Sequence, residues 1–207
     1  MSDATVSLLR DGPERTITAI SRRGLRPQNQ RSHPPDRTLW ETLNRPVPAF
    51  IERHGLPKTM LEVFKAFRTD VAKLKTKNIE WQVAFDDLRD AAYQIWPSLS
   101  LDEKARYFRH LSAWYDTHRF RLPPQVEKKL TCYQLDGRLR YRAGFLGGCT
   151  PKGRSIQVNI RDRGRSSYTE EKFDAVINCT GPERDPRRSG NPFLKDLIQK
   201  GFSTASP

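Results

Sequence analysis

The segment Asp174-Ala-Val-Ile-Asn-Cys-Thr-Gly181 constrains the fold more than any other part of the chain. It contains a short apolar run of strand type and a tip of small residues, which Pro182 follows. An apolar run bounded by turn residues is typical of a buried parallel strand, and ligands of open α/β sheets bind at the carboxyl ends of such strands. The pattern therefore predicts a buried strand over Phe173–Cys179 whose tip faces a ligand. An ordinary core strand that ends in a turn is the alternative.

The amino end has the pattern of the second half of a nucleotide-binding βαβ unit. Met1–Arg10 has apolar residues at helical spacing, Asp11-Gly12-Pro13 ends that helix, and Thr16–Ile20 predicts a strand. The strand leads into Ser21-Arg22-Arg23. In such units an acidic residue at this place binds the ribose of NAD, whereas arginine accommodates the 2′-phosphate of NADP. These three residues are therefore candidates for binding NADP, and a solvated basic turn is the alternative.

A glycine-rich phosphate loop does not occur in the sequence. The nearest match, Gly144-Phe-Leu-Gly147-Gly148, follows a strand-like segment and leads into Cys149–Gly153, which we expect to form a turn rather than a helix. We therefore reject it as a phosphate loop. In a βαβ unit the loop precedes the helix, which places it ahead of Met1.

Three separated motifs together resemble a known family. They are Ile17–Gln28, then Phe108-Arg-His-Leu-Ser-Ala-Trp114 with His118–Arg121, and then Ile177–Pro182. In this order they are similar to the FAD/NAD(P)-binding flavoproteins, bacterial relatives of the two-dinucleotide flavin oxidoreductases. The likeness extends from Met1 to about Gly201.

The resemblance implies an α/β fold: a partial Rossmann-like sheet with an all-helical insertion and a β-meander. It also implies FAD and NADP(H) as cofactors, with hydride passing from NADPH to FAD. Arg22 and Arg23 would select the 2′-phosphate. The residues expected to pass under the dinucleotide or flavin are Asn178, Thr180, Gly181 and Pro182. No catalytic residue is assigned.

The chain also departs from the family pattern. Family members have an amino-terminal FAD-binding unit and a second glycine-rich loop, and neither is present. Gln30 and Phe120 stand where the family has histidines. These departures predict a truncated member that does not retain FAD and is inactive alone. A non-functional gene fragment is an open alternative.

The expected segments follow from the changes in hydrophobic period. Residues 1–28 form the partial NADP-binding unit, and residues 29–57 form a loop-rich connection with short anchors at Leu39–Leu43 and Phe50–Ile51. Residues 58–137 form the helical insertion. Residues 138–201 form a β-meander with a return strand, and residues 202–207 form a frayed tail. The insertion is expected to contain helices over Thr59–Lys75, Ile79–Ile95, Leu101–Tyr115 and from Pro124 to about Asp136. A capping box of Ser100 and Glu103 begins the third.

The carboxyl-terminal part has the period of strands. Leu139–Ala143 and Ile156–Ile160 alternate in polarity, which predicts an antiparallel pair, with a polar turn over 161–171. Asn191–Ile198 predicts a last short helix. His110, Trp114 and His118 recur every four residues, which favours a partly buried aromatic seam over a ligand-binding triad.

Composition leaves one alternative function open. The formal net charge is +13 and the pI is near 10.0, which would also suit a basic module that binds nucleic acid or an acidic partner. Nucleic acid is not expected, because no interleaved aromatic and basic platform is visible. The three cysteines lack metal-site spacing and no metal site is expected. No signal peptide or membrane span is visible, so we expect a cytoplasmic protein without a membrane partner.

Overall fold

The structure is a computed structural model that describes residues 1–32, 46–181 and 185–204. The chain divides into two compact units, Met1–Phe145 and Leu146–Pro207. The predicted anchor at Leu39–Leu43 and the candidate site residue Pro182 lie outside the described residues.

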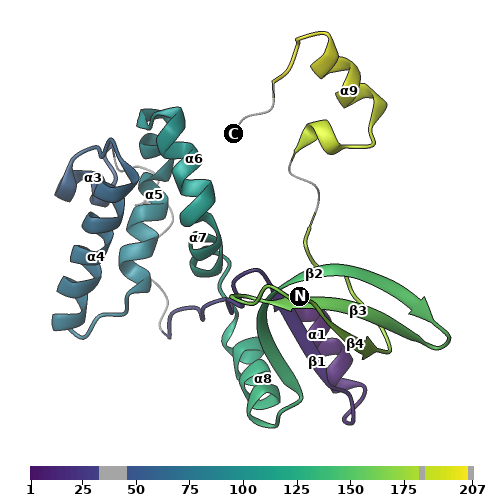
Figure 1. Cartoon of the computed structure of the whole chain (residues 1–207). Helices are drawn as coiled ribbons and strands as arrows, with labels where there is room; N and C mark the ends of the chain where they lie inside the picture. The colour runs from purple at the N-terminus through teal and green to yellow at the C-terminus, as the bar shows by residue number, and fades with distance from the viewer. Residues whose placement is uncertain (33–45, 182–184, 205–207) are drawn as a thin grey trace. The chain divides into compact units, whose positions relative to one another are not determined.

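The first unit contains a parallel strand pair with its own helices (Figure 1). Helix α1 (Ser2–Arg10) leads into β1 (Ile17–Ser21), and α8 (Pro124–Leu135) leads into β2 (Leu139–Lys152). Ile17 lies opposite Leu139 in the parallel register. The buried residues of this core are Leu9, Leu122, Leu130 and Leu139. The predicted amino-terminal helix and strand are therefore confirmed.

The helices between β1 and α8 pack around a second core. They are α3 (Ala49–His54), α4 (Met60–Thr76), α5 (Gln82–Ser98), α6 (Leu101–His110) and α7 (Ser112–Arg119). Both α3 and α4 contact α5, and α4 also contacts α6. The buried residues of this core are Phe50, Met60, Val63, Ala91, Ile95 and Leu99. Their helical spacing is the pattern that predicted these helices, and the first two predicted helices of the insertion are confirmed.

A capping box fixes the start of α4. Thr59 Oγ1 accepts a hydrogen bond from Glu62 N at 3.2 Å, and Glu62 Oε2 accepts from Thr59 N at 3.4 Å. Glu62 Oε2 also accepts from Lys58 N at 2.7 Å. These hydrogen bonds lower the pKa of Glu62, with the bond from Lys58 the largest cause.

Removing the Thr59 hydroxyl tests this cap. We expect Thr59→Ala to lower the free energy of unfolding by about 1 kcal/mol, because the Glu62 amide in the first turn loses its side-chain acceptor. Urea unfolding followed by circular dichroism measures the loss. Thr69→Ala is the matched control, since that hydroxyl only donates to Lys65 O within the same helix. Equal losses in the two variants would contradict a capping role.

The predicted capping box of α6 is only half formed. Ser100 Oγ accepts from Glu103 N at 3.3 Å, as predicted. The Glu103 carboxylate, however, accepts from Met60 N at 2.6 Å and pairs with Arg106 at 2.9 Å. Glu103 therefore satisfies the first amide of α4, because the packing of α6 on α4 brings that amide within reach.

The third predicted helix of the insertion, Leu101–Tyr115, is divided at Leu111. Helix α6 ends at His110 and α7 begins at Ser112. The Ser112 hydroxyl donates to Phe108 O at 3.0 Å, a competing bond that is common where helices bend. The helix that His110, Trp114 and His118 were expected to share is therefore interrupted: His110 ends α6, whereas Trp114 and His118 lie four residues apart in α7. The expected aromatic surroundings are found for His118, which packs on Trp81 and Phe85, whereas Trp114 is 45% exposed.

The second unit is a β-meander followed by a short helical tail. After the turn at Gly153-Arg154, β3 (Ser155–Asp162) pairs antiparallel with β4 (Thr169–Phe173). The carboxyl-terminal segment contains η1 (Pro186–Arg188) and α9 (Pro192–Gln199), whose predicted start at Asn191 is confirmed by its side-chain cap. Two predictions are wrong here: β2 continues through the expected turn at Cys149 as far as Lys152, and β4 begins inside the expected polar turn.

The prediction of a buried strand over Phe173–Cys179 is also wrong. Only Phe173 belongs to a strand, and the following residues lie outside any helix or strand and are exposed, Val176 by 43% and Ile177 by 54%. A buried parallel strand needs neighbouring strands and helices on both faces. Among the described residues no strand pairs with Ala175–Cys179.

The described strands form one mixed sheet in the order β1-β2-β3-β4, so the fold class is α/β. The pair β1 and β2 is parallel and the pair β3 and β4 is antiparallel. Within the described ranges, none of the helices has the length and apolar character needed to cross a membrane.

Candidate functional site

The turn that follows β1 holds the first group of predicted site residues. Ser21 is the last residue of the strand, and its Oγ accepts a hydrogen bond from Gly24 N at 2.9 Å. This bond closes the turn and leaves the hydroxyl hydrogen free to donate. Arg22 is exposed and has no partner among the residues that the structure describes. The Arg22 guanidinium and the Ser21 hydroxyl hydrogen are therefore both available to a ligand.

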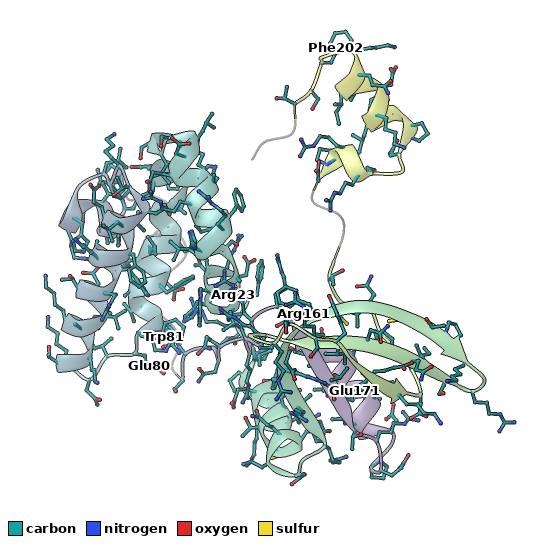
Figure 2. All side chains as sticks on the ribbon, viewed as in Figure 1. Arg23, Glu80, Trp81, Arg161, Glu171 and Phe202 are labelled. Carbon is teal, nitrogen blue, oxygen red and sulfur yellow. The ribbon has the colours of Figure 1, made fainter. Side chains whose placement is uncertain are left out.

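Arg23 has a different role from Arg22. Its Nη2 donates to the backbone oxygen of Arg109 at 2.9 Å, and the residue, labelled in Figure 2, is partly buried. Arg109 lies in the last turn of α6, where backbone oxygens lack partners within the helix. Arg23 thus ties the turn to the helical part of the first unit.

A glycine allows this turn to lie against β2. Gly24 has a φ of +62°, and a Cβ placed on it would lie 3.0 Å from Ala143 N and 3.1 Å from Ala143 Cβ. Ala143 is opposite Ser21 in the parallel register. Both the backbone conformation and the close approach therefore require glycine at this position.

Two of the three motifs that carry the family resemblance lie together. Gln28 N donates to Thr117 O at 2.9 Å, and Leu122 N donates to Gln28 O at 2.7 Å. Gln30 N donates to Leu122 O at 3.0 Å and continues the pairing. The segment after the β1 turn is therefore held beside the end of α7 and the residues that follow it.

An aromatic cluster holds His118 and Arg121, which follow the tryptophan motif. The His118 ring stacks on the Phe85 ring with 5.9 Å between the ring centroids, and it meets the Trp81 ring edge-on with 5.0 Å between the centroids. The Arg121 guanidinium lies 5.8 Å from the Trp81 ring and 5.5 Å from the Phe85 ring. Arg121 also forms an ion pair with Asp86. The Trp81 side chain, one of the partners of both residues, can be followed in Figure 2.

The surroundings of His118 fix its tautomer. Its Nδ1 lies 2.7 Å from Trp114 O, and a carbonyl oxygen only accepts hydrogen bonds. Nδ1 therefore carries the hydrogen, and in the neutral ring Nε2 is the acceptor. His118 lies in one of the motifs that carry the family resemblance, whereas its partners Trp81 and Phe85, at the start of α5, belong to no recognisable sequence pattern.

The second group of predicted site residues belongs to the second unit. Asn178 Oδ1 accepts from Thr180 N at 3.0 Å and from Thr180 Oγ1 at 2.8 Å. Gly181 has a φ of +78°. These residues form an exposed local turn rather than the tip of a buried strand. Ser21, Arg22 and Arg23 belong to the first unit, so the structure brings together the members within each group only.

The remaining candidate groups in the described ranges are potential metal ligands and free thiols. No cluster of three or more histidine, cysteine, aspartate or glutamate side chains there is arranged to hold a metal ion. Cys132, Cys149 and Cys179 are exposed and free.

Comparisons of the chain with protein-family models, with curated proteins and with solved structures found no match. Function is therefore inferred from the residues of this chain alone.

Proposed function

We propose that this chain is an FAD/NAD(P)-binding oxidoreductase-like protein with a partial Rossmann-like sheet, in which the turn after β1 binds the 2′-phosphate of NADP(H). The supporting observation is the place of Arg22: an exposed arginine, unpartnered in the described part of the chain, at the carboxyl end of a parallel strand that follows a helix. Dinucleotide-binding units recognise the adenosine ribose at this position.

Each residue of the turn has a role in the proposal. The planar guanidinium of Arg22 binds the phosphate through paired hydrogen bonds. The Ser21 hydroxyl donates one more while it accepts from Gly24 N. Arg23 is a positioning residue, since its own hydrogen bond goes to Arg109 O.

FAD is the second cofactor that the family resemblance implies, although the departures from the family pattern predict that this chain does not retain it. Asn178, Thr180 and Gly181 would contact the dinucleotide or the flavin, because a turn of small residues lets the backbone approach a ligand closely. Bound flavin and nicotinamide supply the redox chemistry, and the protein contributes binding, orientation and electrostatics. The proposal names no catalytic residue.

Cofactor titration tests the role of Arg22. We expect Arg22→Ala to weaken NADP(H) binding by about 10- to 100-fold and to leave NAD(H) binding unchanged, because one charge-assisted contact contributes about 1.5–3 kcal/mol. Isothermal titration calorimetry with both cofactors is the measurement. Arg154→Ala, which removes an exposed arginine from the β2–β3 turn, is the control.

Arg23→Ala separates contact from positioning. We expect this variant to weaken both cofactors by a similar factor, because the whole turn loses its tie to α6. Equal losses for NAD(H) and NADP(H) in Arg22→Ala itself would show that Arg22 does not recognise the 2′-phosphate. The proposal would then fail.

A further inference from the structure

One side of helix α4 forms a regular outward row. Leu61, Lys65, Arg68, Ala72 and Lys75 recur at helical spacing and are all exposed. The opposite side of the helix carries the buried residues Met60, Val63 and Asp70. The row from Lys65 to Lys75 extends roughly 15 Å at 1.5 Å per residue.

The cations along and just after this helix make no salt bridge within the described ranges: Lys65, Arg68, Lys73, Lys75 and Lys77. Lys58 lies ahead of the helix and interacts electrostatically with Glu62. Arg68 lies 5.8 Å from the ring of Phe64, so its guanidinium is held over an aromatic face.

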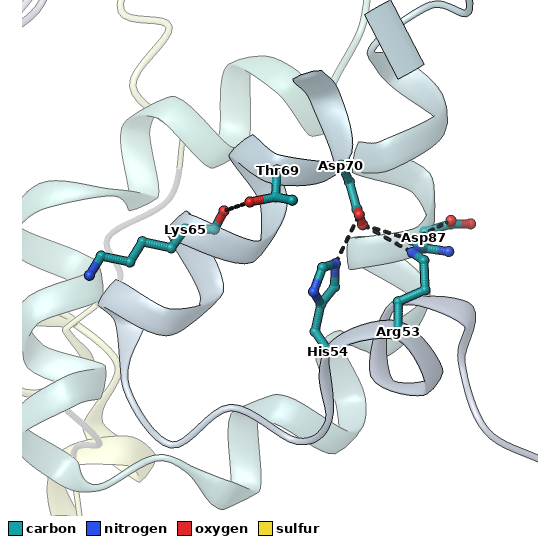
Figure 3. A network of polar contacts seen from close by, with 6 residues as sticks. All are labelled: Arg53, His54, Lys65, Thr69, Asp70 and Asp87. Atoms are coloured by element: carbon teal, nitrogen blue, oxygen red, sulfur yellow. Dashed lines mark hydrogen bonds and ion pairs between the residues drawn. The ribbon is translucent and has the colours of Figure 1, made fainter. Parts of the chain in front are cut away.

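The acids of α4 do not compensate for these charges. Asp70 is buried and bonded to Arg53 and His54, so it faces the core (Figure 3). Glu62 is exposed, but it lies in the first turn and its carboxylate is occupied by the capping box. Beyond the first turn, every charged side chain of the row is therefore a cation.

We propose that this cationic row, defined by Lys65, Arg68 and Lys75, binds the phosphate backbone of duplex nucleic acid. A duplex carries about one negative charge per 1.7 Å of axis, so a row of roughly 15 Å faces several phosphates at once. Backbone contacts of this kind come from lysine and arginine side chains and need no base recognition. None of the residues of the proposed cofactor site belongs to this row. The sequence did not predict nucleic-acid binding, because no interleaved aromatic and basic platform is visible in it.

Other anionic partners fit this row less well. A helix that binds a membrane surface inserts a broad apolar face, whereas α4 buries Met60 and Val63 in the helical core and exposes only two large apolar side chains, Leu61 and Phe64. The buried centres of protein interfaces are depleted in lysine, whereas lysine dominates this row. Single strands are bound by stacking on aromatic rings, and on this side of α4 the Phe64 ring already carries Arg68.

Fluorescence anisotropy with a labelled DNA duplex of mixed sequence tests the proposal in the full chain. We expect binding that weakens steeply between about 50 and 200 mM salt. The triple variant Lys65→Gln, Arg68→Gln, Lys75→Gln should lose more than about tenfold in affinity at the lower salt. The slope of log affinity against log salt should become shallower by about 2–3, because each lost phosphate contact contributes about 0.9.

A matched variant distinguishes the row from total charge. Lys128→Gln, Lys129→Gln, Arg154→Gln removes the same charge from exposed positions outside α4 and should bind like the wild type. Circular dichroism establishes that both variants fold. Equal losses in the two variants, or no duplex binding by the wild type, would overturn the proposal. So would binding to vesicles of anionic lipid or to an acidic peptide in preference to the duplex.

Discussion

Replacing Phe50 with alanine is expected to lower the free energy of unfolding by about 4 kcal/mol, within the range for a large aromatic side chain removed from a core. Phe50 is completely buried and lies in the cluster that α4 and α5 complete. Helix α3 is short and has no side-chain cap, so it depends on this contact to remain in place. The centroid of the Phe50 ring also lies 5.1 Å from the centroid of the His54 ring.

Urea unfolding of Phe50→Ala measures this loss. Phe193→Ala is the control, because that ring is exposed in the second unit and its removal leaves no cavity. Phe50→Leu should recover most of the stability, since it restores much of the buried volume. A loss below about 1 kcal/mol in Phe50→Ala would mean that the core closes over the missing ring.

Replacing Asp70 with alanine is expected to cost about 3 kcal/mol, at the lower end for breaking a buried ion pair. Asp70 is only 4% exposed, and it accepts from Arg53 Nη2 at 2.8 Å and from His54 Nε2 at 2.9 Å (Figure 3). The Arg53 side chain is 37% exposed and also pairs with Asp87, which limits the cost. Burial alone would lower the pKa of Arg53, but the bonds to Asp70 and Asp87 raise it.

Chemical unfolding of Asp70→Ala is compared with Asp174→Ala, which removes an exposed acid of the second unit. The double variant Phe50→Ala, Asp70→Ala adds a second readout. Because both residues hold α3, the combined loss should be smaller than the sum of the single losses by at least about 0.5 kcal/mol. Strict additivity would show that the ion pairs stabilise the fold independently of α3.

Local patterns predicted the helices well. The apolar positions of α4 and α5 repeat at the period of a helix, and Pro124 and Asn191 mark helix starts by their own chemistry. These signals are contained within a few neighbouring residues. The division at Leu111 was missed, because no proline or glycine marks it and the cause is a side-chain hydrogen bond.

Strand pairing was predicted poorly because it depends on residues that are distant in the sequence. Ala175–Cys179 has the composition of a buried strand, yet composition does not say whether a neighbouring strand is present. The predicted pairing of β2 with β3 agrees with their neighbouring places in the sheet, but the parallel pairing of β2 with β1 was not predicted.

The environment of the candidate site residues also depends on residues that are distant in the sequence. Arg22 and Arg23 are adjacent and chemically identical, and only the position of Arg109 O distinguishes the free side chain from the bound one. Likewise, Trp81 and Asp86 surround Arg121 only because α5 packs beside α7.

The pairing of Ile17 with Leu139 also sets an order of assembly during synthesis. About 120 residues separate the two strands, and at 5–20 residues per second the ribosome needs roughly 6–24 s to produce them. Helices form far faster than this, so the helical core between the strands can close while β1 still lacks its neighbour. The turn that carries Arg22 rests on Ala143, so it reaches its final form last. Nascent chains halted before β2 should therefore have a folded helical core and an unformed arginine turn.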